Sequence, residues 1–248
     1  MIPMHTNHHH IFLKLLTVGQ LLLLACNRLP NTMTSSSPET VSQQQTAAEL
    51  RFLALGDSYT IGESVADSER WPVQLAKQLR KQGIAVSDPQ IIARTGWTTD
   101  ELDAAIDAAN PQGPFQLVTL LIGVNNQYRG RAAEEYRVEF VGLLKRAIGF
   151  AGGVAARVIV VSIPDWGVTP FAEGRDRAGI AREIDLFNQI AQKEAATAGA
   201  YFVDITPESR KAATDPALTA PDNLHPSGAM YTAWTELIFP VAVEVCSR

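Results

Sequence analysis

The chain has 248 residues, of which 46% are hydrophobic, 19% charged and 7% aromatic, and its formal net charge is -5. This composition suits one well-packed globular domain and excludes a disordered or coiled-coil protein. The acidic balance, without a long basic run, argues against nucleic acid as a partner. Two cysteines, Cys26 and Cys246, cannot form a disulfide framework, and no cysteine and histidine cluster has zinc-site spacing, so a structural metal is not expected.

The first 25 residues have the composition of a targeting segment. A single charged residue, Lys14, precedes an apolar run over residues 15–25. Such a run is too short to span a bilayer but is typical of a secretory signal peptide. Residues 23–26, Leu-Leu-Ala-Cys, resemble the bacterial lipoprotein box. The resemblance implies that Cys26 carries a diacylglycerol and becomes the mature N-terminus; an ordinary signal peptide followed by a chance cysteine is the alternative.

A polar stretch follows this cysteine. Residues 27–49 consist mainly of Asn, Thr, Ser, Pro and Gln, and contain too few large apolar side chains to fold. We therefore expect a signal peptide over residues 1–25, a lipidated cysteine and flexible tether over 26–49, and a globular domain over 50–248. The mature protein would then be anchored by lipid to a membrane of the cell envelope, facing the periplasm or the cell exterior.

Loss of the leader would leave one histidine in the mature chain. Four of the five histidines precede Cys26, including the run at residues 8–10. We interpret that run as part of the polar N-terminal region of a signal peptide rather than as a metal site. His225 is the histidine that remains.

Residues 50–248 alternate between short apolar runs and amphipathic segments. The apolar runs predict strands over residues 51–55, 89–93, 116–122, 157–163 and 201–205. The amphipathic segments predict helices over residues 71–81, 100–109, 132–150, 181–198 and 227–245. Continuous apolar strands that alternate with such helices predict a three-layer α/β/α sandwich with a parallel, flavodoxin-like five-stranded sheet.

The residues that follow the strands are the candidate site, because open parallel sheets bind ligands outside the carboxyl ends of their strands. Gly-Asp-Ser-Tyr at 56–59, Arg-Thr-Gly-Trp at 94–97 and Gly-Val-Asn-Asn at 123–126 follow three of the predicted strands. Pro-Asp-Trp at 164–166 follows another, and Asp-Asn-Leu-His-Pro at 222–226 precedes the last helix.

This set of segments resembles the SGNH, or GDSL-type, family of serine hydrolases, whose four named residues are Ser, Gly, Asn and His in that order. Here these are Ser58, Gly96, Asn125 and His225, and the resemblance extends from Phe52 to the last helix. It implies a serine esterase that hydrolyses carboxylic (acyl) esters through an acyl-serine intermediate, with neither cofactor nor metal. The substrate would be a small-molecule, lipid or polysaccharide acyl ester.

The chemistry explains why these residue types are needed. A serine hydroxyl is a weak nucleophile near neutral pH and needs a neutral imidazole to accept its proton. We expect Ser58, on an exposed turn, to be the nucleophile and His225 to be the base. Asp222 is expected to orient the imidazole. Asp57 is an alternative acid, although its place beside Ser58 in a tight turn favours a role in ordering the loop.

The tetrahedral intermediate needs hydrogen-bond donors where negative charge develops. The family supplies them from the serine N–H, the glycine N–H and the asparagine side chain, which implies an oxyanion hole of Ser58, Gly96 and Asn125. Asn126 departs from the family pattern, in which aspartate is usual at this place. The departure puts in question the hydrogen bonds of the loop rather than a catalytic role.

Three aromatic residues and the second cysteine are further candidates. Trp97, Tyr128 and Trp166 follow strand ends, where they could line the substrate cleft or pack beneath the loops. Cys246 lies in the last turn of the final predicted helix. We expect it to be a small packed residue rather than a nucleophile.

Other functions are alternatives at this stage. The same acyl-enzyme could pass its acyl group to a sugar or lipid hydroxyl, which would make the protein an acyltransferase. A flavodoxin-like binding module uses the same kind of sheet, but no glycine-rich phosphate loop follows the first strand. A third alternative is an inactive envelope binding lipoprotein of the same fold, against which the complete set of candidate catalytic residues argues.

Overall fold

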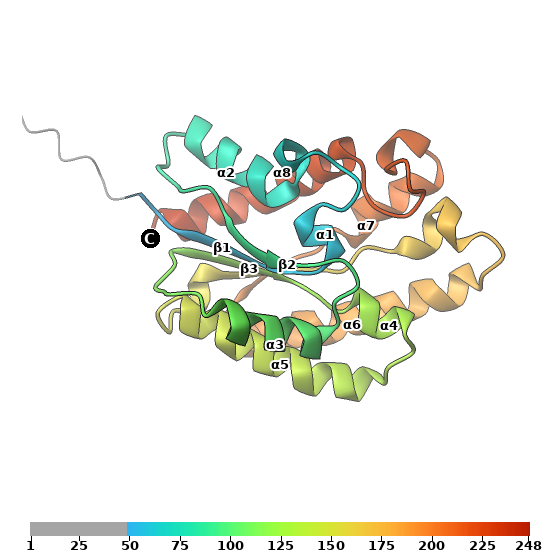
Figure 1. Cartoon of the computed structure of the whole chain (residues 1–248), viewed down its shortest axis with the longest axis horizontal. Helices are drawn as coiled ribbons and strands as arrows, with labels where there is room; N and C mark the ends of the chain where they lie inside the picture. The colour runs from blue at the N-terminus through green and yellow to red at the C-terminus, as the bar shows by residue number, and fades with distance from the viewer. Residues whose placement is uncertain (1–48) are drawn as a thin grey trace, which may run out of the picture. The chain divides into compact units, whose positions relative to one another are not determined.

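Five short parallel strands form the centre of the computed structural model, which describes residues 49–248 (Figure 1). The strands are β1 Phe52–Gly56, β2 Gln90–Ala93, β3 Leu117–Leu121, β4 Val158–Val161 and β5 Tyr201–Val203, in the order β2-β1-β3-β4-β5. The predicted parallel five-stranded sheet is therefore confirmed. The predicted leader, Cys26 and most of the tether lie outside the described residues.

Burial explains why some strands were easier to predict than others. Every residue of β1, β3 and β4 is buried, because helices cover both faces of the sheet. The edge strands β2 and β5 are only partly buried. The sequence of residues 89–93, Pro-Gln-Ile-Ile-Ala, is likewise less continuously apolar than those of the central strands.

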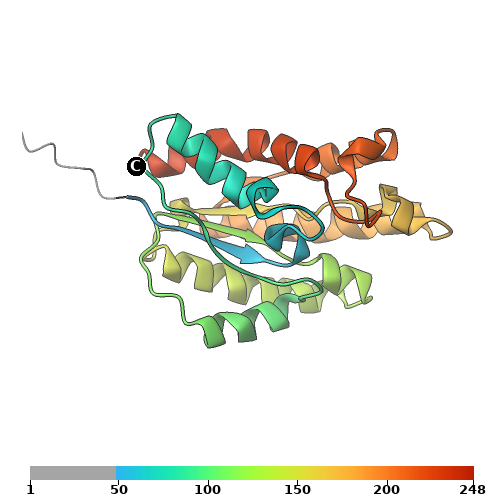
Figure 2. The same ribbon diagram turned by 45° about the horizontal axis from the view of Figure 1, so that its top comes forward.

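Five long helices form the two outer layers (Figures 1 and 2). On one face lie α2 Trp71–Lys81 and α8 Gly228–Cys246, which pack against each other. On the other lie α3 Thr99–Ala109, α5 Ala133–Phe150 and α6 Arg177–Ala198. The predicted three-layer sandwich is confirmed. None of the helices in the described part of the chain is long and apolar enough to cross a membrane.

Helix boundaries depend on caps that hydrophobic periodicity does not reveal. Helix α6 begins at Arg177, four residues before the predicted start, because the Asp176 carboxylate accepts a hydrogen bond from the Gly179 N–H at 2.9 Å. Three short helices were not predicted: α1 Ser58–Ile61, α4 Val124–Tyr128 and α7 Thr206–Ser209. The 3-10 helices are η1 Asp67–Glu69, η2 Ala155–Arg157, η3 Trp166–Val168, η4 Pro170–Ala172, η5 Arg210–Ala213 and η6 Pro216–Leu218.

The strand order places a crevice beside β1. From β1 the chain first adds β2 on one side and then crosses to add β3 on the other. In a sheet of this order, the point where the direction of winding reverses, between β1 and β3, is the usual position of the ligand site. The segments after β1 and β3 carry Ser58 and Asn125.

Candidate active site

Ser58 begins α1 directly after β1, at a tight strand-to-helix turn. The Asp57 carboxylate caps this helix by accepting a hydrogen bond from the Tyr59 N–H at 3.0 Å. Gly56 has no room for a side chain, because a Cβ atom there would lie 2.2 Å from the Thr60 Oγ1 atom. The expectation that Ser58 lies on an exposed turn is wrong. Its relative exposure is 4%, since the turn forms part of the wall of a cavity.

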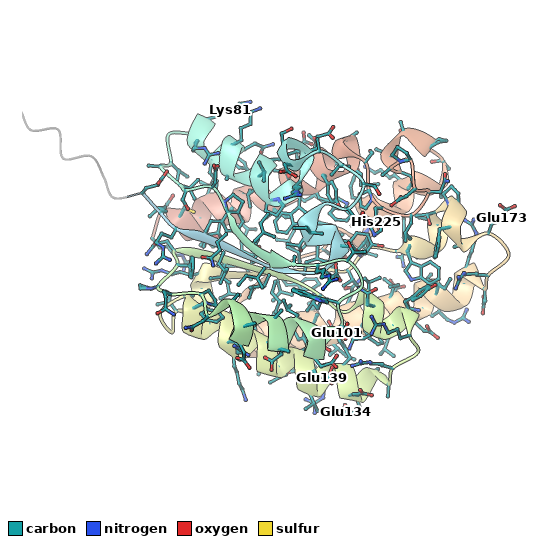
Figure 3. The ribbon with its side chains drawn as sticks, in the orientation of Figure 1. Lys81, Glu101, Glu134, Glu139, Glu173 and His225 are labelled. Carbon is teal, nitrogen blue, oxygen red and sulfur yellow. The ribbon has the colours of Figure 1, made fainter. Side chains whose placement is uncertain are left out.

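His225 lies on the loop before α8 and is held by Asp222. The Nδ1 atom of the imidazole is 2.6 Å from Asp222 Oδ2, while Asp222 Oδ1 accepts hydrogen bonds from the N–H groups of His225, at 2.9 Å, and Leu224, at 3.0 Å. Figure 3 shows His225 beside α1, at the end of the sheet toward which the strands run. With Nδ1 engaged by the carboxylate, Nε2 is the imidazole nitrogen left for proton transfer.

A second hydroxyl donates to the same carboxylate. Ser64, in the loop after α1, donates from Oγ to Asp222 Oδ2 at 2.6 Å. Partial burial alone would raise the pKa of Asp222, but the hydrogen bonds from Ser64, His225 and Leu224 outweigh it and hold that pKa well below its ordinary value. Asp222 is therefore ionised throughout the neutral range.

Gly96 and Asn125 come together from the loop after β2 and the short helix after β3. Gly96, after β2, has a φ angle of 88°, a conformation that residues with a Cβ atom rarely adopt. Asn125, in α4, donates one amide hydrogen to the Trp97 carbonyl at 2.9 Å. An asparagine amide has a second N–H, and no hydrogen bond to the rest of residues 49–248 occupies it.

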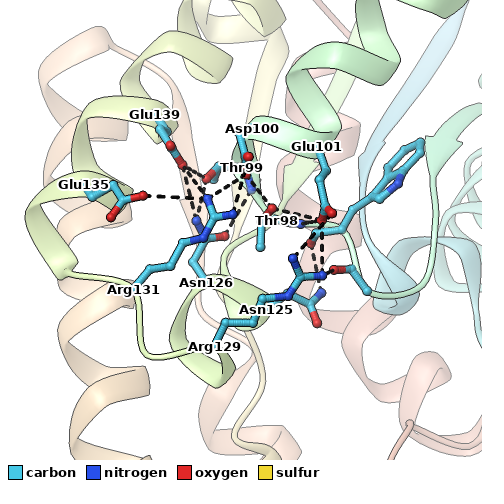
Figure 4. Close-up of polar contacts among 12 residues, drawn as sticks. Thr98, Thr99, Asp100, Glu101, Asn125, Asn126, Arg129, Arg131, Glu135 and Glu139 are labelled. Atoms are coloured by element: carbon cyan, nitrogen blue, oxygen red, sulfur yellow. Dashed lines mark hydrogen bonds and ion pairs between the residues drawn. The ribbon is translucent and has the colours of Figure 1, made fainter.

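A polar network fastens the Gly96 loop to α4 and α5 (Figure 4). Asn126 is fully buried and accepts a hydrogen bond from the Thr99 N–H at 3.1 Å. Its amide donates to Thr99 Oγ1 at 2.6 Å and to Glu139 at 3.4 Å, and Thr99 Oγ1 itself donates to Glu139. The loop thus keeps its hydrogen bonds although asparagine stands where aspartate was expected.

Two arginines extend this network. Arg129 donates to the Gly96 carbonyl at 2.6 Å and pairs with Glu101 at 3.3 Å, while Arg131 pairs with Asp100 at 2.7 Å. We call the set of Thr99, Asn126, Arg129, Arg131 and Glu139, with the acids they contact, the polar latch. It fixes the backbone around Gly96 relative to Asn125.

One cavity of about 180 Å³ brings the candidate residues together. Its wall includes Ser58, Gly96, Asn125 and His225, and also Tyr128 and Trp166. Trp97 is not among the residues of this wall, which agrees with the alternative that it packs beneath the loops. Its side chain packs against the hydrophobic core, and only its carbonyl contributes near the site, as the acceptor for Asn125.

Two nearby residues were missed from the sequence. Phe171 also lines the cavity, and Ser64 contacts Asp222. Leu224, from the candidate segment 222–226, lines the cavity as well. A hydrogen bond of 3.0 Å from the Phe171 N–H to the Asn223 carbonyl connects the loop after β4 to the His225 loop. No local motif marks Phe171, whereas Ser64 has a φ angle of 67°, which is unusual for a residue other than glycine.

The remaining titratable candidates have other surroundings. Asp57 is fully buried, and burial raises its pKa from 3.8 to about 7. Its Oδ2 atom has no hydrogen-bond partner within residues 49–248. Burial also raises the pKa of the Cys246 thiol to about 11, which suppresses its reactive thiolate form. In the same part of the chain, no three His, Cys, Asp or Glu side chains are grouped as a metal site would require.

Comparisons with known proteins address the family and the fold of the chain. A model of the GDSL-like lipase/acylhydrolase family matches residues 54–233. The structure is similar to that of TesA, with a TM-score of 0.62, 19% identity and coverage of 79% of this chain and 99% of that chain. The psychrotrophic esterase EstA from Pseudoalteromonas sp. gives a TM-score of 0.59 and 15% identity, covering 81% and 100%.

A variant of the acetyl xylan esterase Axe2 from Geobacillus stearothermophilus is also similar, with a TM-score of 0.56, 18% identity and coverage of 78% of this chain and 94% of that chain. No curated protein matches the sequence. At such low identity, the likeness to these solved structures establishes the shared fold.

Proposed function

The chain belongs to the GDSL-like lipase/acylhydrolase family, and on that basis we propose that it is a serine esterase that hydrolyses carboxylic esters through an acyl-serine intermediate. The observation that carries this proposal is the shared cavity, whose wall contains both Ser58 and the His225 that Asp222 holds. A nucleophile, a base and an orienting acid are the three groups that such a reaction needs.

The first half of the reaction forms the acyl-enzyme. Ser58 Oγ attacks the ester carbonyl carbon while its proton moves to Nε2 of His225, and Asp222 stabilises the imidazolium. The negative charge on the carbonyl oxygen is stabilised by the N–H groups of Ser58 and Gly96 and by the Asn125 amide. The intermediate then expels the alcohol, which takes the proton from His225.

The second half restores the serine. Water enters, gives its proton to His225 and attacks the acyl carbon, and the second tetrahedral intermediate releases the carboxylic acid as the proton returns to Ser58 Oγ. If a sugar or lipid hydroxyl entered instead of water, the same steps would transfer the acyl group.

Removal of the serine hydroxyl tests the proposal. Ser58→Ala should reduce hydrolysis of 4-nitrophenyl acetate to a residual rate, because the acyl-enzyme can no longer form. Ser68→Ala changes an exposed serine in η1 and is the matched control. Circular dichroism should give the same spectrum for the wild type, Ser58→Ala and Ser68→Ala. Full activity in a folded Ser58→Ala variant would eliminate Ser58 as the nucleophile.

We also propose that the mature protein is a lipoprotein of the cell envelope, anchored through Cys26. The support is the sequence of residues 23–26 and the polar stretch over 27–49. Growth with labelled palmitate should label the wild-type protein but not Cys26→Ser. An unlabelled wild-type protein that begins after a conventional cleavage site would overturn the anchor and leave the proposed esterase activity unaffected.

A further inference from the structure

The lining of the cavity at the proposed active site contains a polar set and an apolar set of residues, which we call its polar side and its apolar side. Apart from Thr95, the polar side consists of the residues that the proposed chemistry uses. The apolar side is formed by six residues: Tyr59, Val124, Tyr128, Trp166, Phe171 and Leu224. Within residues 49–248, no Asp, Glu, Lys or Arg side chain lines the cavity. A charged group bound against this wall would lose its hydration without gaining an ionic partner, so the bound group must be neutral.

Hydrogen bonds keep the apolar wall in place. Trp166 is 4% exposed, and its Nε1–H donates to Gln127 Oε1 at 2.8 Å. The Gln127 amide in turn donates to Glu183 at 2.7 Å. The Tyr128 ring meets the Trp166 ring edge-on, with 5.3 Å between their centroids. The wall is therefore formed before any ligand arrives, which lowers the entropic cost of binding.

Arg175 adds a second constraint on the same rings. Its guanidinium carbon lies 5.4 Å from the centroid of the Tyr128 ring, 5.3 Å from that of Trp166 and 5.2 Å from that of Phe171. At these distances a cation is attracted to each ring face. Because Arg175 does not line the cavity, its charge holds the aromatic wall together and does not face the bound group.

The size of the cavity limits the group that it can hold. An engineered apolar cavity of about 150 Å³ binds benzene, which has six carbon atoms. At about 180 Å³, the cavity beside Ser58 is close to that size. An acetyl, butanoyl or hexanoyl chain would fit, whereas the hexadecanoyl chain of a membrane lipid would extend far beyond the wall.

The order of chemical events indicates which half of the ester lies against this wall. After the first step the acyl group is bonded to Ser58, which is nearly buried, while the alcohol must leave and water must enter. Tyr128 and Phe171 are 47% and 38% exposed, so they form the rim where the cavity opens to solvent. The alcohol therefore departs past this rim, and the acyl chain stays inside.

We propose that the apolar side of the cavity is an acyl pocket that selects neutral, short-chain acyl groups, from acetyl to about hexanoyl. This inference rests on the proposed esterase function and adds the class of acyl group. Longer chains are excluded by the Trp166 wall and by the Tyr128 and Phe171 rim.

Two series of esters test the pocket. One series varies the acyl chain of 4-nitrophenyl esters from acetyl to hexadecanoyl, and the other varies the alcohol of acetate esters. In the first series we expect kcat/KM to rise by about three- to fourfold per methylene while the pocket fills. It should then fall by at least about tenfold between hexanoyl and decanoyl, because chains longer than about six carbons no longer fit. In the second series we expect kcat/KM to change less with alcohol size.

Two variants locate the pocket in the structure. Phe171→Ala and Tyr128→Ala shorten side chains that are more than a third exposed, so the fold should tolerate them. Each should move the preferred acyl chain to a longer one. The matched control is Leu186→Ala in α6, which removes an apolar side chain of 45% exposure that does not line the cavity and should leave the preference unchanged.

The outcomes separate this inference from the esterase proposal. Highest kcat/KM for hexadecanoyl esters, or a stronger dependence on the alcohol than on the acyl chain, would overturn the pocket and leave ester hydrolysis intact. An unchanged preference in both rim variants would also overturn it. If no ester of either series is hydrolysed and Ser58 also resists covalent labelling by a fluorophosphonate, the esterase proposal itself fails.

Discussion

The two sides of the proposed active site are held in different ways. Around the proposed oxyanion hole, the polar latch joins the Gly96 loop to α4 and α5 through several hydrogen bonds and ion pairs (Figure 4). Around the proposed base, the position of His225 depends on one carboxylate, that of Asp222. This carboxylate accepts a hydrogen bond from outside its own loop, which Ser64 donates. Loss of one bond from a shared network leaves the other bonds in place, whereas loss of the single carboxylate leaves the imidazole without its orienting partner.

Replacement of Asp222 should have the largest effect. Asp222→Asn removes the negative charge and places an amide opposite Nδ1 of His225, which favours the wrong tautomer. We expect kcat to fall by about 10³- to 10⁴-fold, with KM much less affected. Steady-state kinetics with 4-nitrophenyl butanoate measures this, and a loss of less than about tenfold would show that His225 does not depend on Asp222.

Replacement of Ser64 should reduce activity less than replacement of Asp222. Ser64→Ala removes one charge-assisted hydrogen bond from Asp222 but leaves the others, so we expect kcat to fall by about tenfold.

A matched variant separates the hydroxyl from the strained backbone at this position. Ser64→Gly also lacks the hydroxyl but accepts the φ angle of 67° without strain. Ser64→Gly should lose as much activity as Ser64→Ala but should melt at a higher temperature than Ser64→Ala. If activity followed the melting temperature instead, Ser64 would have only a structural role.

The polar latch should tolerate a single change better. Asn126→Asp replaces the amide that donates to Glu139 with a second carboxylate, and we expect the free energy of unfolding to fall by about 1 to 3 kcal/mol with only a few-fold loss of kcat. Glu139→Gln in the same protein removes the like-charge contact and should recover part of the stability. Denaturant unfolding of the two single variants and the double variant measures the coupling.

Asp57 should have the smallest effect on activity and a clear effect on stability. Its pKa is about 7 in the folded protein against an ordinary 3.8, so between those values the folded state retains a proton that the unfolded state has lost. The stabilisation from that proton is fully present below about pH 4 and disappears as the pH rises through about 7.

Asp57→Asn removes this dependence, because an amide stays neutral while still able to accept the Tyr59 N–H. Relative to the wild type, its free energy of unfolding should increase with pH between about 4 and 7, by at most about 4 kcal/mol. Unfolding curves at several pH values check this. If Asp57→Asn lowered turnover more than Asp222→Asn, the roles of the two acids would have to be exchanged.

The layers of the fold could be predicted because they depend on repeated patterns. The continuous apolar runs of β1, β3 and β4 and the amphipathic α2 and α5 carry their signal over many residues. Helices α1 and α4 have four and five residues and depend on local caps and glycine conformations. Hydrophobic periodicity does not identify helices as short as these.

Candidate site residues could be predicted where they directly follow the strands of the parallel sheet. Ser58, Gly96 and Asn125 follow parallel strands, whose carboxyl ends share one edge of the sheet. Ser64 could not be found in this way, because its contact with Asp222 spans 158 residues of sequence. The two alternatives for Trp97 could not be separated for a related reason, since its place in the chain does not determine the direction of its side chain.

Intact-protein mass spectrometry after reaction with a fluorophosphonate, followed by peptide mapping, tests directly whether Ser58 is the nucleophile. We expect one covalent adduct, located on Ser58, that forms much more slowly in Asp222→Asn and is absent from Ser58→Ala. An unmodified wild-type protein, or an adduct on another residue, would contradict it.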